Sequence, residues 1–232
     1  MRRILIVIGL ALLFASCNKG GQSFMQTNSG SAGTSSNSST GGGASSGGAS
    51  TSSTGGSASA DATGGEPVER PTPTTAQLNA LEGGQEVKWD QQGMTWKLPK
   101  GWIKETAETT SFNYRSAGGG DFAFLIVNIS PLGADFPTDM SLKATYDQQV
   151  TRKKNGQVED VRWMELDGVK GVAFREAMPE GQEDPRRLQW IAYRKYAGQT
   201  QMVNLMLSTK GRSFEKYQDT LYGILYSTKL GH

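Results

Sequence analysis

Every tryptophan and every tyrosine of this 232-residue chain lies after residue 84. Large aromatic side chains supply much of the apolar area that a folded core buries. Their confinement therefore predicts one folded domain over residues 84–232. A domain of that length buries about 70% of the surface of its unfolded chain and needs no disulfide bonds.

The segment before this domain has a very different composition. Residues 20–65 consist almost entirely of Gly, Ser, Thr, Ala and Asn, and their only large apolar residues are Phe24 and Met25. Such a segment cannot bury enough apolar surface to offset the loss of backbone entropy on folding. We therefore expect residues 17–83 to form a disordered tether with a span of roughly 45 Å. The prolines of residues 66–73 should stiffen its end toward polyproline II, and the Ser and Thr content also permits O-glycosylation.

The start of the chain has the three parts of a secretory signal peptide. A positive amino end with Arg2 and Arg3 is followed by an apolar run over residues 4–14, and two small residues come next. The run is far shorter than the roughly 20 residues that a membrane-spanning helix needs. We predict that residues 1–16 are removed on export.

Cys17 is the only cysteine of the chain. Together with the preceding Phe14-Ala15-Ser16 it resembles the lipobox of bacterial lipoproteins, with Phe14 at the position where that family usually has Leu. The resemblance implies cleavage just before Cys17 and lipidation of its thiol, and two acyl chains such as palmitate hold a protein stably at a membrane. An exported protein has little use for one unpaired thiol unless it is modified. The alternative is an ordinary secretory signal that happens to contain a cysteine.

The residue after the cysteine bears on where the anchored protein resides. Asn18 is not the Asp that is linked in enterobacteria to retention at the inner membrane. We therefore expect a lipid anchor in the bacterial cell envelope, at the outer membrane facing the periplasm rather than at the inner membrane or the cell surface.

The charge balance of the domain argues against nucleic acid as a partner. Residues 84–232 hold 20 basic and 18 acidic residues, without the excess that binding to a polyanion requires. The densest basic cluster is Arg152-Lys153-Lys154. At the end of a predicted helix it is explained by a favourable interaction with the helix dipole, and the alternative is a binding patch.

Short apolar or alternating segments, several joined by Gly-containing turns, predict the strands of the domain. Asp-Gly at residues 167–168 is a strong signal for a two-residue hairpin, and Ala197-Gly198 is expected to turn a second long hairpin. The predicted strands are residues 86–89, 94–98, 111–115, 121–129, 157–166, 169–178, 188–196 and 201–208.

Two helices complete the predicted fold. Leu142, Tyr146 and Val150 recur at a spacing of four after the candidate N-cap Ser141, and Ser213 can cap a final helix with one apolar stripe. The order is hairpin, strands, helix, four meandering strands and helix. It predicts an α+β fold, an antiparallel sheet with helices packed against it.

Several of these segments resemble the PsbP-like domains. The carrying features are Trp-Lys-Leu-Pro-Lys-Gly-Trp at residues 96–102, the strands at 112–114 and 122–129, and the closing helix that ends at residues 224–227. The resemblance covers residues 86–230 and implies an α/β/α sandwich with a central antiparallel sheet flanked by helices. It also implies protein binding or assembly more than catalysis, although fold alone does not fix function. The plant representative helps photosystem II retain calcium and chloride, and a eukaryotic relative binds a small GTPase; neither role has a matching motif here.

The residue inventory lacks the groups that most enzymes use. The only histidine is His232, the last residue, and the only cysteine is Cys17. No Ser-His-Asp or Cys-His arrangement and no zinc site of His and Cys ligands is available. The glycines at 118–120 lack the Lys-Ser/Thr ending of a phosphate-binding loop and are better explained as a turn. We expect no catalytic residue, no metal and no cofactor, and hence no enzyme.

Two groups of carboxylates are candidates for chemistry. Glu180, Glu183 and Asp184 share one loop and offer oxygen ligands for calcium, but the EF-hand spacing is absent, which favours a solvated loop. Glu159 and Asp160 occupy neighbouring strand positions, so their side chains are expected on opposite faces, where they cannot act as a catalytic pair.

Three hypotheses for function remain open. The first is a non-catalytic binding or assembly domain, held at the membrane through Cys17 and reaching an envelope protein or cell-wall partner through its tether. The second is a carrier or sensor of a small ligand, with Trp163 and Trp190 lining a cleft; the alternative for these two side chains is core packing. The third is an enzyme that uses only Asp, Glu, Lys or Tyr.

Overall fold

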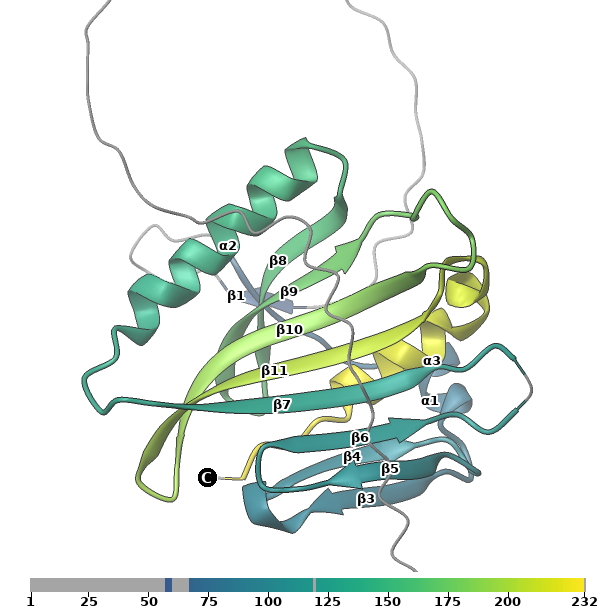
Figure 1. The fold of residues 1–232 in the computed structure, drawn as a ribbon, viewed down its shortest axis with the longest axis horizontal. Helices are drawn as coiled ribbons and strands as arrows, with labels where there is room; N and C mark the ends of the chain where they lie inside the picture. Colours follow the sequence, from purple (N-terminus) through teal and green to yellow (C-terminus); the bar gives the residue numbers. More distant parts are fainter. Residues whose placement is uncertain (1–56, 60–66, 119, 232) are drawn as a thin grey trace, which may run out of the picture. The chain divides into compact units, whose positions relative to one another are not determined.

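A computed structural model describes residues 57–59, 67–118 and 120–231 of the chain. The predicted signal peptide, Cys17, most of the predicted tether and His232 lie outside the described residues. The described part forms one nine-stranded sheet, one two-stranded sheet and three α-helices (Figure 1). None of its helices has the length and apolar content that a membrane span requires.

The strand order of the large sheet is β1-β2-β8-β9-β10-β11-β7-β6-β5, and β3 pairs with β4 in the small one. Short 3₁₀ turns precede β4 (Asp90–Gln92) and α3 (Gly211–Ser213). The strands are β1 (Ser57–Ser59), β2 (Val68–Arg70), β3 (Gln85–Trp89), β4 (Met94–Leu98), β5 (Ile103–Ala107), β6 (Ser111–Arg115), β7 (Phe124–Leu132), β8 (Val158–Leu166), β9 (Val169–Glu176), β10 (Pro185–Tyr196) and β11 (Gln199–Lys210), and the helices are α1 (Thr75–Ala80), α2 (Thr138–Lys154) and α3 (Phe214–Tyr226).

The predicted α+β class is confirmed, with one difference in the sheet. All neighbouring strands run antiparallel except β2 and β8, which pair in parallel through Val68 opposite Trp163 and Glu69 opposite Met164. The large sheet is therefore mixed rather than wholly antiparallel as predicted. The early hairpin, β3 and β4, is also separate from it.

The two faces of the large sheet bury two separate cores. Figure 1 shows α2 lying across β8 to β10, and Leu142 of α2 packs there with Trp163 and Phe174. On the other face α1, α3 and the two-stranded sheet enclose a larger core that contains Trp96 and Trp190. Alternate strand residues point to opposite faces, so each central strand contributes to both cores.

The two long hairpins form at the predicted turns. Asp167 and Gly168 have φ values of 47° and 81°, and Ala197 and Gly198 have 49° and 79°. Positive φ at both central residues is typical of the type I′ turn, whose twist matches that of the flanking strands. The second hairpin is longer than predicted, because β10 and β11 remain paired from Pro185 opposite Lys210 to the turn.

The folded structure begins before the predicted boundary at residue 84. Strand β2 lies in the segment that was expected to extend the tether, and its Val68 is buried. Glu69 accepts a hydrogen bond from Arg162 at 3.0 Å, and Arg70 donates two to Glu165 at 2.9 and 2.8 Å. Composition analysis misses these contacts because the partners lie more than 90 residues away along the chain.

Helix α1 also lies within the predicted tether. Thr74 and Gln77 form a capping box at its start, in which each side chain binds the backbone of the other residue. The helix packs against α3, where Gly223 is required: a Cβ at that position would lie 2.9 Å from the Gln77 carbonyl oxygen. The tether prediction for residues 67–83 is therefore wrong.

Three smaller expectations also differ from the structure. Strand β5 was not predicted because its five residues are mostly exposed and polar. Helix α2 begins at Thr138 rather than after Ser141, whose hydroxyl instead lies 2.6 Å from that of Tyr193. Ser213 does precede α3, but its side chain makes no capping hydrogen bond.

Two leucines near α1 test whether this segment belongs to the folded domain. Leu81 is 3% exposed and Leu78 is 56% exposed. We expect Leu81→Ala to lower the free energy of unfolding by about 2–4 kcal/mol, because it leaves a cavity. Leu78→Ala should change it by no more than about 0.5 kcal/mol. Urea denaturation measures both, and equal small effects would contradict the docking of this segment.

Candidate functional site

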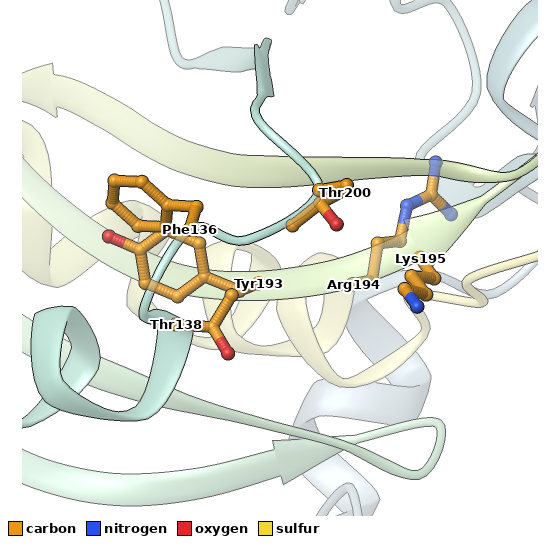
Figure 2. A pocket seen from close by; sticks show the side chains of 7 residues that line it. Phe136, Thr138, Tyr193, Arg194, Lys195 and Thr200 are labelled. Atoms are coloured by element: carbon orange, nitrogen blue, oxygen red, sulfur yellow. The ribbon is translucent and has the colours of Figure 1, made fainter.

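A cleft of about 270 Å³ opens between the connection from β7 to α2 and the tip of the β10–β11 hairpin. Figure 2 shows aromatic side chains at one end and cationic side chains at the other, with Thr200 between them. The residues that line it are Ala134, Phe136, Thr138, Tyr193, Arg194, Lys195 and Thr200.

The aromatic end is built by two rings from distant parts of the chain. The ring centroids of Phe136 and Tyr193 are 5.6 Å apart, with their planes tilted by 36°. The Tyr193 hydroxyl is hydrogen-bonded to the Ser141 hydroxyl of α2 at 2.6 Å. Because a ring contact and a hydrogen bond both hold Tyr193, the aromatic end is fixed before any ligand arrives.

The other end of the cleft carries two neighbouring cations of β10. Alternation along the strand places Lys195 on the same face of the sheet as Tyr193, and places Arg194 on the opposite face. Lys195 is exposed and forms no salt bridge with any residue that the structure describes. Thr200 lies directly opposite Lys195 on β11 and is buried.

Arg194 is buried without a carboxylate partner. It is 7% exposed and donates to the backbone oxygen and Oε1 of Gln92 and to the Gly231 carbonyl. Its guanidinium also lies 4.6 Å from the centre of the Tyr196 ring. Burial lowers the pKa of Arg194 from its ordinary value.

The other arginines of the described residues behave differently. Eight of the nine form salt bridges, and Arg194 is the exception. A buried charge without an opposite charge is costly. Only neutral oxygens and an aromatic ring balance it here, so its positive charge adds to that of Lys195 at this end of the cleft.

The two tryptophans that were expected to line a ligand cleft lie elsewhere. Trp190 is fully buried and donates its indole N–H to the Met164 carbonyl at 3.2 Å. Trp163 stacks on Tyr146 of α2 at 4.6 Å, in the core of the opposite face. The cleft hypothesis for these side chains is wrong, because strand alternation turns both into the cores.

The acidic loop before β10 is tied into ion pairs. Glu183 lies 2.8 Å from both Lys210 and Arg212. Within the described residues no group of three or more His, Cys, Asp or Glu side chains is arranged to hold a metal ion. The carboxylates of this loop that have partners therefore serve to hold it to the end of β11.

Glu159 and Asp160 do not follow the regular alternation between the two faces of the sheet on which the prediction was based. A register shift between Val158 and Asp160 interrupts the alternation of β8. Glu159 pairs with Arg175 at 3.2 Å, and Asp160 lies 3.5 Å from Arg162. Both carboxylates are thus held by arginines, in an arrangement that belongs to cross-strand packing.

The predicted basic cluster does end a helix. Arg152, Lys153 and Lys154 occupy the last turn of α2, and Arg152 lies 3.8 Å from Glu176 of β9. This position is favourable for positive charge.

Sequence reasoning did not identify the cleft. Tyr193 and Lys195 appear in the sequence only as alternate residues of a strand, and Phe136 lies in an expected connection. Only the packing of the connection against the hairpin brings the two rings together. The described residues that line the cleft carry no carboxylate, imidazole or thiol, and their rings, hydroxyls and cations are suited to binding.

No family model matches the chain, and no curated protein matches it. Among solved structures, cyanobacterial PsbP from Synechocystis sp. PCC 6803 is similar, with 15% identity and a TM-score of 0.41, covering 63% of this chain and 91% of that chain. LpqN, involved in cell envelope biogenesis of Mycobacterium tuberculosis, has 13% identity and a TM-score of 0.47, covering 65% and 87%. The Saccharomyces cerevisiae Ran-binding protein Mog1p has 12% identity and a TM-score of 0.38, covering 63% and 95%. At these identities the likeness concerns the fold alone.

The hydroxyl of Tyr193 provides a test of how the aromatic end is held. Tyr193→Phe should lower the free energy of unfolding by about 1 kcal/mol, because Ser141 loses its partner. Tyr196→Phe is the matched control, since the Tyr196 hydroxyl makes no hydrogen bond to a described residue and its ring still covers Arg194. Thermal unfolding compares the two, and equal effects would show that the 2.6 Å contact does not hold the ring.

Proposed function

We propose that this chain is a lipoprotein of the bacterial envelope that presents a non-catalytic protein-binding or assembly domain. The observation that carries the proposal is the position of Cys17, the sole cysteine, two small residues after a short apolar run and before a long Gly/Ser/Thr segment. Acylation at Cys17 anchors the chain, and the tether lets the domain reach a partner away from the membrane surface. We place the anchor in the outer membrane, facing the periplasm.

The cleft supports a role in binding a protein. Met140, in the first turn of α2, is 73% exposed and follows Thr138 of the cleft by two residues. Phe, Tyr and Met side chains are enriched in the central parts of protein interfaces. A fixed pair of aromatic rings, with an exposed methionine in the helix turn that begins at the cleft, therefore suits contact with a partner protein.

The size of the cleft suits a side chain of a partner protein and lies just below the range of sites for drug-sized ligands. Sites for drug-sized ligands usually measure about 300–1,000 Å³ and enclose most of the ligand. This cleft has about 270 Å³ and no tryptophan in its lining. A side chain or two of a partner protein fill such a volume.

The anchor is tested by metabolic labelling with a palmitate analogue. We expect the wild-type chain to be labelled and to sediment with membranes, and we expect Cys17→Ala to be unlabelled and released, because no acyl chain holds it. Equal labelling of the two chains would rule out lipidation at Cys17.

The protein-binding role is tested by placing a photo-crosslinking amino acid at position 140 in cells. The matched control carries it at position 78, on α1 of the opposite face, where the native Leu78 is also exposed. We expect one envelope protein to be crosslinked from position 140 and not from position 78, as identified by mass spectrometry. The same products from both positions, or none from either, would contradict a partner at the cleft.

A further inference from the structure

We propose that the cleft recognises a carboxylate-bearing segment of the partner protein, taking an apolar side chain at its aromatic end and the carboxylate at Lys195. The inference rests on the proposed protein-binding function and specifies the chemistry of the partner. It follows from three features of the cleft: its two unlike ends, its unbalanced positive charge and its size.

The two ends of the cleft call for two kinds of group side by side. Phe136 and Tyr193 present ring surface, and the Tyr193 hydroxyl is already occupied by Ser141. An apolar side chain is thus the natural occupant of that end. At the other end, Lys195 and the threonine opposite it, Thr200, supply a cation and a hydroxyl (Figure 2).

The positive charge of the second end is not balanced within the described residues. Lys195 has no salt bridge, and Arg194 behind it is held by neutral oxygens and by the ring of Tyr196. Within the described part every other arginine has an acidic partner, whereas seven lysines besides Lys195 have none, so the buried Arg194 is the unusual cation here. A concave surface lined by charge of one sign concentrates the field and attracts the opposite charge.

Two aspartates are next to lining residues in the sequence, and neither forms an ion pair with these cations. Asp135 directs its carboxylate back toward Gly133, where a Cβ would lie 3.0 Å from its Oδ1. Asp139 occupies the first turn of α2, where a negative charge is favourable next to the helix dipole. Neither aspartate forms a salt bridge with Lys195 or Arg194.

The size of the cleft sets the size of the recognised unit. A volume of about 270 Å³ accommodates one apolar side chain and a neighbouring carboxylate. The smallest unit that offers both is an apolar residue next to Asp or Glu, or an apolar residue at a chain's carboxyl end. Such a segment lies along the cleft from the aromatic pair to Lys195.

The test uses blocked tetrapeptides as probes and the exported chain carrying Cys17→Ser, which lacks the thiol for acylation. The probes are Gly-Phe-Glu-Gly and the same peptide with Gln or Lys in place of Glu. We expect the Glu peptide to shift the amide NMR signals of residues 134–136, 138 and 193–195 most strongly, and this binding should weaken as salt is added. Equal binding of the three peptides, or shifts elsewhere in the domain only, would overturn the proposal.

A charge reversal separates Lys195 from the general charge of the domain. Lys195→Glu should weaken binding of the Glu peptide about fivefold or more, since an attraction becomes a repulsion. Lys104→Glu on β5 makes the same charge change at another exposed lysine without a salt bridge, and it should leave binding unchanged. Both changes lie on the surface, so both variants are expected to fold, and circular dichroism checks this. An equal loss in both variants, or none in either, would refute the role of Lys195.

The outcomes separate this inference from the proposed function. Crosslinking from position 140 without any preference among the peptides would leave the protein-binding role standing and remove the carboxylate. Two results together support both the protein-binding role and the carboxylate. One is a crosslinked partner, and the other is a preference for the Glu peptide that is lost in Lys195→Glu and kept in Lys104→Glu. A peptide preference without any crosslinked partner would remove the proposed function and leave only a carboxylate-binding cleft.

Discussion

The register of the β10–β11 hairpin is the constraint on which most of the structure depends. The turn at Ala197-Gly198 holds positive φ at both residues and aligns the strands along their whole length. Because neighbouring residues face opposite sides, this one register sends Trp190 into the larger core and Tyr193 to the face that α2 covers. A slip by one residue would exchange the two faces and place Lys195 where Arg194 is now buried. The same turn that forms the sheet therefore also forms the cleft at its tip.

Charge is handled in two ways in this domain. On β2, β8, β9 and β10, arginines form ion pairs with carboxylates of nearby strands. These partners offset part of the desolvation cost of the partly buried guanidinium groups. Arg194 follows another rule: it joins the turn at Gln92 to Gly231 through neutral acceptors and leaves its Nε without a partner. A buried pair can often be replaced by apolar residues without loss of stability, whereas here one charge remains uncompensated beside a cleft. The proposed recognition of a carboxylate at the cleft gives a reason for keeping the buried charge of Arg194 despite its cost in stability.

The sequence predicts those parts of the fold whose signals are local. Asp167-Gly168 specifies its hairpin through its own backbone preferences, and so does Ala197-Gly198. Strand β2 carries no local signal, because Glu69 and Arg70 are fixed by partners on β8 that only folding brings near. The cleft has the same difficulty: the ring of Phe136 meets that of Tyr193 across more than 50 residues of chain. Periodicity assigned the tryptophans to strands correctly, but it does not tell a core face from a cleft wall when both faces are covered.

In the binding that we propose, the two ends of the cleft have different physical roles. At the aromatic end, Tyr193 is fixed by Phe136 and Ser141, so a ligand orders little there and most of the burial of its apolar side chain appears as affinity. Lys195 has a long and mobile side chain in contact with solvent, and an ion pair formed there loses much of its energy to hydration and side-chain entropy. Such a cation contributes more to the rate of encounter and to the rejection of wrong partners than to affinity. On the tether that we propose this division would be useful, since such a tether raises the local concentration of partners within its reach and discrimination between them becomes the main requirement.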